Sequence, residues 1–139
     1  GLLNFYPTTE LAQVLHSCAR IAHADCTTGE ALRRLGLSVF EEILHSTAGR
    51  FLYSMGINDI RTVISLTKKA YEFFAPQVRV SLEHLSDTEL LLQYRNLWTY
   101  PQFYHVGIVQ GALTAYHESD RILIRVHSDC DVDLLLTLK

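Results

Sequence analysis

Apolar residues recur at helical spacing through the first half of the chain and alternate with polar residues through much of the second half. Spacings of three and four residues predict helices, and strict alternation predicts half-buried strands. The pattern predicts an α+β fold in the order ααααββαββ, a bundle of four helices plus two antiparallel hairpins with a fifth helix between them. We expect residues 1–139 to form a single domain, since a chain of this length buries one sizeable core.

The first four helices are predicted from apolar stripes and from residues typical of helix ends. The expected end residues are Thr8 or Thr9 as the first N-cap, Thr27 with Glu30 as a capping box, Gly56 as the end of the third helix, Asn58 as the fourth N-cap and Pro76 as the final stop. The expected core stripe of the first helix is Leu11, Val14, Leu15, Cys18 and Ile21. The later stripes are Leu32, Leu35, Val39, Phe40, Ile43 and Leu44, then Ala48, Phe51, Leu52 and Met55, then Ile60, Val63, Ile64, Thr67, Tyr71 and Phe74.

Two hairpins are predicted where apolar residues begin to recur at every second position, the spacing typical of strands. Residues 77–83 form the first strand, and a second strand runs from Leu90 to near Asn96. Residues 121–126 and 132–138 form the second pair. The fifth helix lies between the hairpins. Its expected start has Thr99 as N-cap, Pro101 in the first turn, Gln102 at N3, and Trp98 placed to contact Phe103.

The register of the second hairpin follows from the alternation, because inward residues must lie opposite inward residues and paired positions must sum to an even number. A sum of 258 places Arg125 opposite Asp133, and Leu123 beside Leu135 on the outward face. Adjacent leucines in water form an apolar patch. We expect Leu123 and Leu135 to be part of a homodimer contact, or to be ordinary surface leucines that need no partner.

Gly107 and Gly111 lie four residues apart on the predicted fifth helix, on the same face as Phe103 and Ala115. Such a face lets another backbone approach closely, which indicates either packing of the helix on the sheet or room for a ligand. The nearby aromatic side chains are suited to the wall of an apolar pocket or to a filled core. The predicted ligand-binding residues are Tyr94, Trp98, Phe103, Tyr104, His105, Gly107 and Gly111.

The histidines do not indicate a metal site. His23, Asp25 and Cys26 straddle a helix end without a second pair of ligands, and the segment 127–131 has the residues typical of a turn. His105 is expected to be a hydrogen-bonded residue of the core or of the pocket. We therefore predict no metal site.

Composition narrows the function classes. A net charge of −3 without a long Lys/Arg cluster does not favour nucleic acid as a partner. We expect no membrane span, because no apolar run approaches the roughly 20 residues required, and the three cysteines fit a cytoplasmic, reducing compartment. The P-loop, Gly-x-Ser-x-Gly, Gly-x-Gly-x-x-Gly and His-Glu-x-x-His motifs are all missing from the sequence. The chain begins at Gly1, so further domains could precede it.

The element order and the segment from Phe103 to Leu113 resemble the ligand-binding superfamily of nitric-oxide signalling and Golgi transport. This superfamily includes 4-vinyl reductase domains, haem-nitric-oxide-binding domains and small trafficking subunits. More narrowly, four segments look like a myxobacterial family of paralogues of unassigned function. These segments are Tyr6-Pro7, residues 33–36, residues 46–50 and residues 101–113.

The resemblance implies cofactors whose ligands this chain lacks. Haem-binding relatives have a Tyr-x-Ser-x-Arg motif before the last helix, where this chain retains only Tyr94, and a proximal histidine in a helix corresponding to residues 58–74, which contains none. Zinc-holding relatives use several cysteines, some in the last hairpin, where this chain has Cys130 alone. We expect haem and zinc to be improbable.

The leading hypothesis is a non-enzymatic sensor or regulatory module. It would bind a small apolar ligand between the fifth helix and the sheet, signal through homodimerisation, or do both. The alternative is a protein-interaction or assembly module with a filled core, and a third hypothesis is an enzyme with a dispersed site. A cavity of a few hundred cubic ångströms beside Gly107 and Gly111 would favour the ligand-binding hypothesis.

Overall fold

The structure is a computed structural model that describes residues 8–54, 59–118 and 121–139. Its helices and strands, in chain order, are α1 (Thr8–Ala22), α2 (Thr28–His45), α3 (Thr47–Ser54), α4 (Ile60–Phe74), β1 (Arg79–His84), β2 (Glu89–Arg95), the π-helical turn η1 (Pro101–His105), α5 (Val106–Ala115), β3 (Ile122–Val126) and β4 (Val132–Thr137). The predicted α+β class and the order of elements are confirmed. The predictions for Met55, Gly56 and Asn58 lie outside the described residues.

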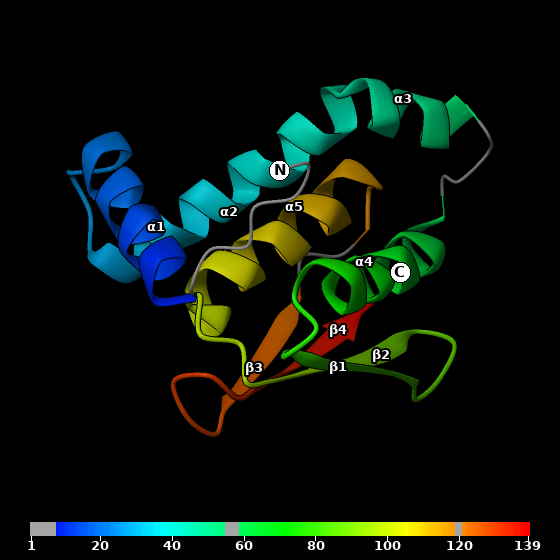
Figure 1. The fold of residues 1–139 in the computed structure, drawn as a ribbon. Helices are drawn as coiled ribbons and strands as arrows, with labels where there is room; N and C mark the ends of the chain where they lie inside the picture. Colours follow the sequence, from blue (N-terminus) through cyan, green and yellow to red (C-terminus); the bar gives the residue numbers. More distant parts are fainter. Residues whose placement is uncertain (1–7, 55–58, 119–120) are drawn as a thin grey trace.

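The strands form one antiparallel sheet in the order β1-β2-β4-β3, with the helices on one side of it (Figure 1). Helices α4 and α5 lie nearest the sheet, α2 runs along the far side of α5, and α1 and α3 lie at opposite ends of α2. The predicted register of the second hairpin is confirmed, since Arg125 pairs with Asp133 and Leu123 pairs with Leu135. No helix in the described part of the chain is long and apolar enough to cross a membrane.

The main core lies between the sheet and helices α4 and α5. The inward residues of the two central strands are fully buried, among them Leu90, Tyr94, Val132, Leu134 and Leu136. They pack against a buried set from the helices, which comprises Ile60, Ile64, Val106, Val109, Ala112 and Leu113. These apolar side chains fill the layer between α5 and the sheet, where the sequence predicted a ligand. In this layer, the described residues form a core.

Helix α1 differs from its predicted burial. Leu15 and Ala19 are buried, but Val14 is 57% exposed, Ile21 is 85% exposed, and Cys18 is also exposed. The prediction that this stripe faces the core is wrong for these three residues and for Leu11, which is half-exposed. The reason is that the small side chain of Ala19, rather than the larger apolar residues, allows α1 to approach α2. The stripes of α2 and α3 also extend past the core, because Ile43 and Phe51 are exposed.

Of two predicted N-caps, one is confirmed and the other is wrong. The hydroxyl of Thr27 accepts a hydrogen bond from the Glu30 backbone N–H at 3.3 Å, which confirms the cap of α2. The predicted cap at Thr99 is wrong. Tyr100, in the left-handed conformation with φ 58°, directs its carbonyl to three successive N–H groups of η1, and the Thr99 hydroxyl bonds His105 instead.

Helices α2 and α5 contact each other through their backbones at two glycines. A Cβ atom on Gly107 would overlap the carbonyl of Arg33, and one on Gly36 would overlap the carbonyl of Tyr104. A third glycine, Gly29, lies against the ring of Phe103, where a Cβ atom would approach Cε1 to 2.7 Å. Only residues without a side chain permit this approach. The predicted close packing of the fifth helix is therefore against α2 rather than against the sheet.

Strand β3 forms one edge of the sheet and exposes apolar side chains on both faces. Leu123 points outward and is 53% exposed. Ile124 and Val126, which lie opposite the buried Leu134 and Val132, are also about half exposed because the helices cover the central strands more fully than this edge. Arg125 lies between them on the outward face.

Gly107→Ala should lower the free energy of unfolding by about 2 kcal/mol or more, because the added methyl group overlaps the α2 backbone and overpacking typically costs ~1–3 kcal/mol. Gly111→Ala is the matched control. Its Cβ atom would lie 3.1 Å from Phe40 Cβ, and alanine favours a helix over glycine by about 1 kcal/mol, so little net change is expected. Denaturant unfolding of both variants measures the difference, and equal stabilities would contradict the backbone contact.

Candidate functional site

A groove of about 480 Å³ lies between α2 and α5 beside Gly111. Phe40 and Leu37 supply apolar surface from α2, and Gly111 and Ala115 supply it from α5. Polar side chains of both helices complete the lining, namely Ser38, Glu41, His45 and Thr114. The groove has a volume within the usual range of ligand sites, about 300–1,000 Å³, and combines apolar walls with a few polar groups, as such sites do.

Gly107 and Gly111 have different surroundings although they lie on one face of α5. At Gly107 the α2 backbone occupies the space that a side chain would need, and Gly107 itself is buried. At Gly111 the nearest atoms are those of Phe40 and Leu37, and the glycine borders the groove. A groove therefore lies next to Gly111, whereas at Gly107 the α2 backbone occupies the corresponding space.

A second candidate feature is a buried group that we call the tyrosine–histidine cluster, made of Tyr71, Tyr94, Thr99, Tyr104 and His105. These residues come from α4, β2, the loop before η1, and η1 itself. The His105 ring is hydrogen-bonded at both nitrogens, to the Tyr71 hydroxyl at Nδ1 and to Thr99 Oγ1 at 2.8 Å from Nε2. Ring centroids of Tyr71, Tyr94 and Tyr104 lie 5.1–5.9 Å from that of His105.

Burial keeps this cluster uncharged. It lowers the pKa of His105 to about 3, so the imidazole is neutral at physiological pH. Burial also raises the pKa of Tyr71, Tyr94 and Tyr104. A neutral imidazole with one donor and one acceptor already engaged is suited to holding α4 and η1 together, and less to abstracting a proton.

The Tyr94 hydroxyl is an exception within the cluster. It is fully buried and forms no hydrogen bond of good geometry with the described residues, although a polar contact with the neighbouring Tyr71 hydroxyl affects its pKa. A buried polar atom without a partner costs free energy unless a water molecule or a ligand group satisfies it.

Two other predicted ligand-binding residues lie nearer the surface. The Trp98 ring is about half exposed, and its indole N–H donates to Asn96 Oδ1 at 2.7 Å. Phe103 covers Gly29 and is also partly exposed. The structure therefore brings Tyr94, Tyr104 and His105 together, places Trp98 and Phe103 apart from them, and places Gly111 at the groove. From the sequence, Tyr71 was predicted to lie in the core stripe of the fourth helix and was not counted among the site residues.

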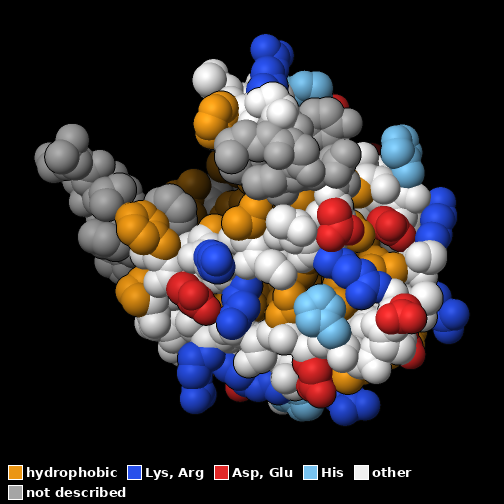
Figure 2. All heavy atoms as spheres, turned by 90° about the vertical axis from the view of Figure 1, so that its right-hand side faces the viewer, with side chains coloured by type: hydrophobic (Ala, Val, Ile, Leu, Met, Phe, Trp, Pro, Cys, Tyr) orange, Lys and Arg blue, Asp and Glu red, His pale blue; other side chains and the backbone are white. Residues whose placement is uncertain are grey.

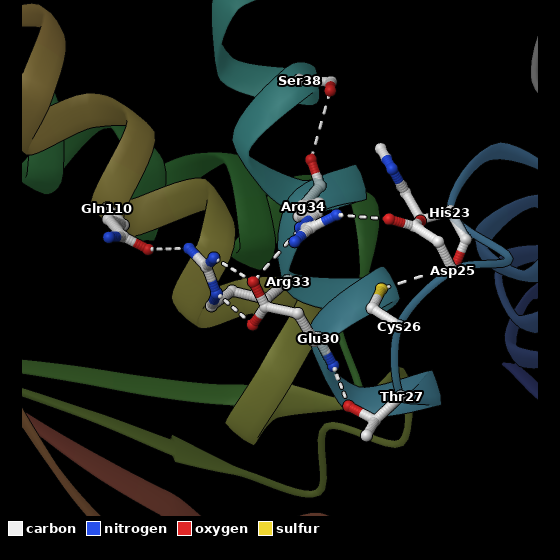
Figure 3. A network of polar contacts seen from close by, with 9 residues as sticks. All are labelled: His23, Asp25, Cys26, Thr27, Glu30, Arg33, Arg34, Ser38 and Gln110. Atoms are coloured by element: carbon white, nitrogen blue, oxygen red, sulfur yellow. Dashed lines mark hydrogen bonds and ion pairs between the residues drawn. The ribbon is translucent and has the colours of Figure 1, made fainter.

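A polar network joins α2 to α5 (Figure 3). Arg33 donates to both carboxylate oxygens of Glu30, with Nε 2.9 Å from Oε2, and its Nη1 lies 2.6 Å from Oε1 of Gln110 on α5. Arg34 adds a second contact to Glu30. Hydrogen bonds from Arg33 and Arg34 outweigh desolvation and lower the pKa of Glu30 to about 2.

Two groups of residues were considered for metal binding on the basis of the sequence. His23, Asp25 and Cys26 lie beside this network, and residues 127–131 form the turn between β3 and β4. Cys26 Sγ donates to the His23 carbonyl at 3.4 Å. Asp131 accepts from the backbone N–H of Asn96 and from Ser128 Oγ, as turn residues commonly do. Within the described ranges, no three His, Cys, Asp or Glu side chains gather closely enough to hold a metal ion.

A family model described as "Protein of unknown function (DUF2378)" matches residues 2–137. The chain belongs to this family. The comparison with curated proteins finds no match. The narrower likeness to myxobacterial paralogues stays a prediction.

Solved structures of H-NOX proteins share the fold of this family member. A point mutant of the H-NOX protein from K. algicida, in the unliganded Fe(II) state, superimposes with a TM-score of 0.71 at 15% identity, covering 98% of this chain and 75% of that one. The H-NOX from S. oneidensis in the Fe(II)NO state gives 0.64 at 15%, covering 98% and 78%. The IWP-051-bound H-NOX from Shewanella woodyi in the Fe(II)CO state gives 0.65 at 19%, covering 97% and 73%. The likeness to the nitric-oxide-signalling superfamily thus holds for the fold.

The sequence predicted that haem is improbable, because motif residues of the haem-binding relatives are missing. This prediction is wrong. Solved proteins that share this fold include H-NOX proteins in Fe(II) states, and another neighbour was solved to probe heme distortion in that family. Among the described histidines His105 is the buried one, and both of its ring nitrogens are engaged, so the present arrangement does not fit an iron ligand at that residue.

Glu30→Gln should reduce the pH dependence of stability. A folded-state pKa of about 2, below the ordinary 4.5, stabilises the fold above the unfolded pKa, and this contribution is lost as the pH falls from 4.5 towards 2. Urea unfolding at pH 7 and pH 3 should show a larger loss for the wild type than for Glu30→Gln. Arg33→Gln should reduce the loss partly, since Arg34 remains. Parallel behaviour of Glu30→Gln and wild type would refute the assignment.

Tyr94→Phe should leave stability unchanged or raise it slightly, because the deleted hydroxyl forms no hydrogen bond of good geometry with the described residues. Tyr71→Phe removes one partner of the buried His105 ring and should cost about 1–3 kcal/mol. The two variants remove the same atom from neighbouring rings and control for each other. Thermal or urea unfolding compares them, and an equal loss in both would indicate that the Tyr94 hydroxyl has a partner such as a buried water.

Proposed function

We propose that this chain is a non-enzymatic sensor or regulatory module that binds a small, largely apolar ligand in the groove between α2 and α5. The observation that carries the proposal is the groove of about 480 Å³ beside Gly111. The sequence predicted the ligand between the fifth helix and the sheet. Buried apolar side chains fill that layer, so we propose the groove between α2 and α5 instead.

The position of the groove suits a sensor. A ligand in it contacts both α2 and α5, whose separation is set by the glycine contacts one turn away. If the ligand binds one arrangement of these two helices more tightly than another, its binding shifts the conformational equilibrium towards the tighter-binding arrangement. Since α5 leads into β3, such a shift reaches the sheet through the chain itself.

The lining specifies the chemistry of the ligand. Phe40, Leu37 and Ala115 favour an apolar body, while Glu41 and His45 at the groove edge favour a hydrogen-bond donor or a cationic group on the ligand. The fold neighbours are H-NOX proteins in Fe(II) states, and therefore haem belongs among the ligands to be tested. The tyrosine–histidine cluster supports a sensor rather than an enzyme, because both ring nitrogens of His105 are already hydrogen-bonded and burial lowers its pKa, which makes it a weak base.

A second candidate function is an assembly module, and the outward face of the sheet favours it. Leu123 and Leu135 lie with Leu85 and Leu91 around a hollow of about 430 Å³. Figure 2 shows that hydrophobic side chains reach the surface between charged ones on one face of the molecule, so apolar exposure alone does not identify a contact. On this hypothesis, Leu123 and Leu135 form part of a homodimer contact and the ligand groove has no role.

The groove should bind the apolar dye ANS, and Ala115→Phe should abolish that binding by filling the groove with a ring. Lys69→Phe, which adds the same ring at an exposed position of α4, is the control and should bind like the wild type. Dye fluorescence measures binding, a haemin titration followed by visible absorbance tests haem separately, and native mass spectrometry detects co-purified ligands. If the wild type binds neither probe and carries nothing from purification, the assembly module becomes the better proposal.

A further inference from the structure

Helix α1 has two apolar faces, and α2 covers one of them. Leu15 and Ala19 are buried against Ala31 and Leu32 of α2. The other face holds Leu11, Val14, Cys18 and Ile21, all exposed in the described structure. In Figure 1 this helix lies at the end of α2, away from the sheet. None of the described residues covers this face.

The spacing of the exposed residues is that of a coiled-coil seam. Positions 11, 14, 18 and 21 follow intervals of three, four and three, which are the a and d positions of a heptad repeat. These intervals read the same in both directions. Two copies of α1 laid antiparallel would therefore place Leu11 opposite Ile21, and Val14 opposite Cys18, of the second copy.

The charges beside this seam distinguish the two ways of pairing. Glu10 and Arg20 lie on the same flank, one in the first turn of α1 and the other in the last. Antiparallel pairing brings Glu10 of one copy to the level of Arg20 of the other, within about two residues or ~3 Å along the axis. Parallel pairing would instead leave Glu10 of one copy and Arg20 of the other about ten residues, or ~15 Å, apart along the axis, too far to interact. Arg20 uses one Nη1 donor for the Cys26 carbonyl, which leaves other guanidinium N–H groups for a carboxylate.

The same flank is recessed. A shallow groove of about 390 Å³ runs along it, lined by Glu10, Gln13, Val14, Ser17, Cys18 and Ile21. Side chains of a facing helix insert into such recesses. Gln13 and Ser17 are neutral, so the flank lacks the row of basic residues that attracts an anionic lipid surface.

We propose that α1 pairs antiparallel with α1 of a second copy of this chain through Leu11, Val14, Cys18 and Ile21. The contact involves a helix of 15 residues, which is about 22 Å long. This is smaller than a standard interface, and a weak dimer with a Kd in the micromolar range or above is expected. The surface is separate from the leucines of the sheet and from the ligand groove.

Disulfide trapping tests both the contact and its direction. In a Cys26→Ser background, Val14→Cys with the native Cys18 should form an intermolecular disulfide under oxidised glutathione, since these positions face each other. Val14→Cys combined with Cys18→Ser should not, because antiparallel pairing keeps the two introduced thiols about four residues apart along the axis. Non-reducing electrophoresis reads the result, and circular dichroism verifies folding. Equal trapping in both variants, or none in the first, overturns the proposal.

A matched pair of variants separates this surface from the sheet. Val14 and Leu123 are exposed to nearly the same extent, 57% and 53%. Val14→Glu should weaken self-association at least about tenfold in sedimentation equilibrium, and Leu123→Glu should leave it unchanged. The reverse result assigns the dimer to the sheet leucines and overturns the proposal, as does a wild type that stays monomeric at high concentration or that binds phosphatidylserine vesicles without self-associating.

The outcome is independent of the ligand groove. Ala115→Phe, which tests ligand binding, should trap through Val14→Cys and Cys18 as efficiently as the variant without it. Loss of trapping in that combination would mean that the α1 contact depends on the groove, contrary to the proposal. Loss of ANS binding with trapping retained would support the α1 contact as a separate surface.

Discussion

The arrangement depends on the contact between the backbones of α2 and α5 at Gly36 and Gly107. Because neither residue has a side chain, the helices approach until each glycine lies against the other helix's backbone. Helix α5 also contributes to the main core, so this contact attaches the outer helices to the sheet. The Arg33 bridge to Gln110 and the Glu30 carboxylate lie beside it. One turn beyond Gly107, Phe40 and Leu37 of α2 line the groove beside Gly111.

Much of the fold could be predicted from the sequence, and particular residues show where prediction stops. The alternation of inward and outward residues in the last hairpin was sufficient to predict its register. A slip by one residue would have exposed the side chains of Leu134 and Leu136 to solvent. The pairing of β2 with β4 was not predictable in this way, since either hairpin could join the other by several edges. In α1 the pattern of larger apolar residues pointed to the wrong face, because the small Ala19 determines which face approaches α2.

The candidate site was less predictable for a related reason. Gly107 and Gly111 could be recognised from the sequence, but their partners on α2 could not, and one glycine contacts a backbone while the other borders a groove. The histidine is hydrogen-bonded in the core, as expected, yet its Tyr71 partner had no polar signal in the sequence. Motif residues missing from the chain argued against haem, although the fold itself is one that H-NOX proteins share.

The edge strand β3 bears on how the protein avoids aggregation. With apolar side chains on both faces, it could template the addition of another strand. An added copy of β3, antiparallel and centred on Leu123, would set Arg125 opposite Arg121, and one centred on Arg125 would set two guanidinium groups face to face. In these two registers the arginines oppose the addition of a second β3 strand, while the leucines on the same face stay exposed.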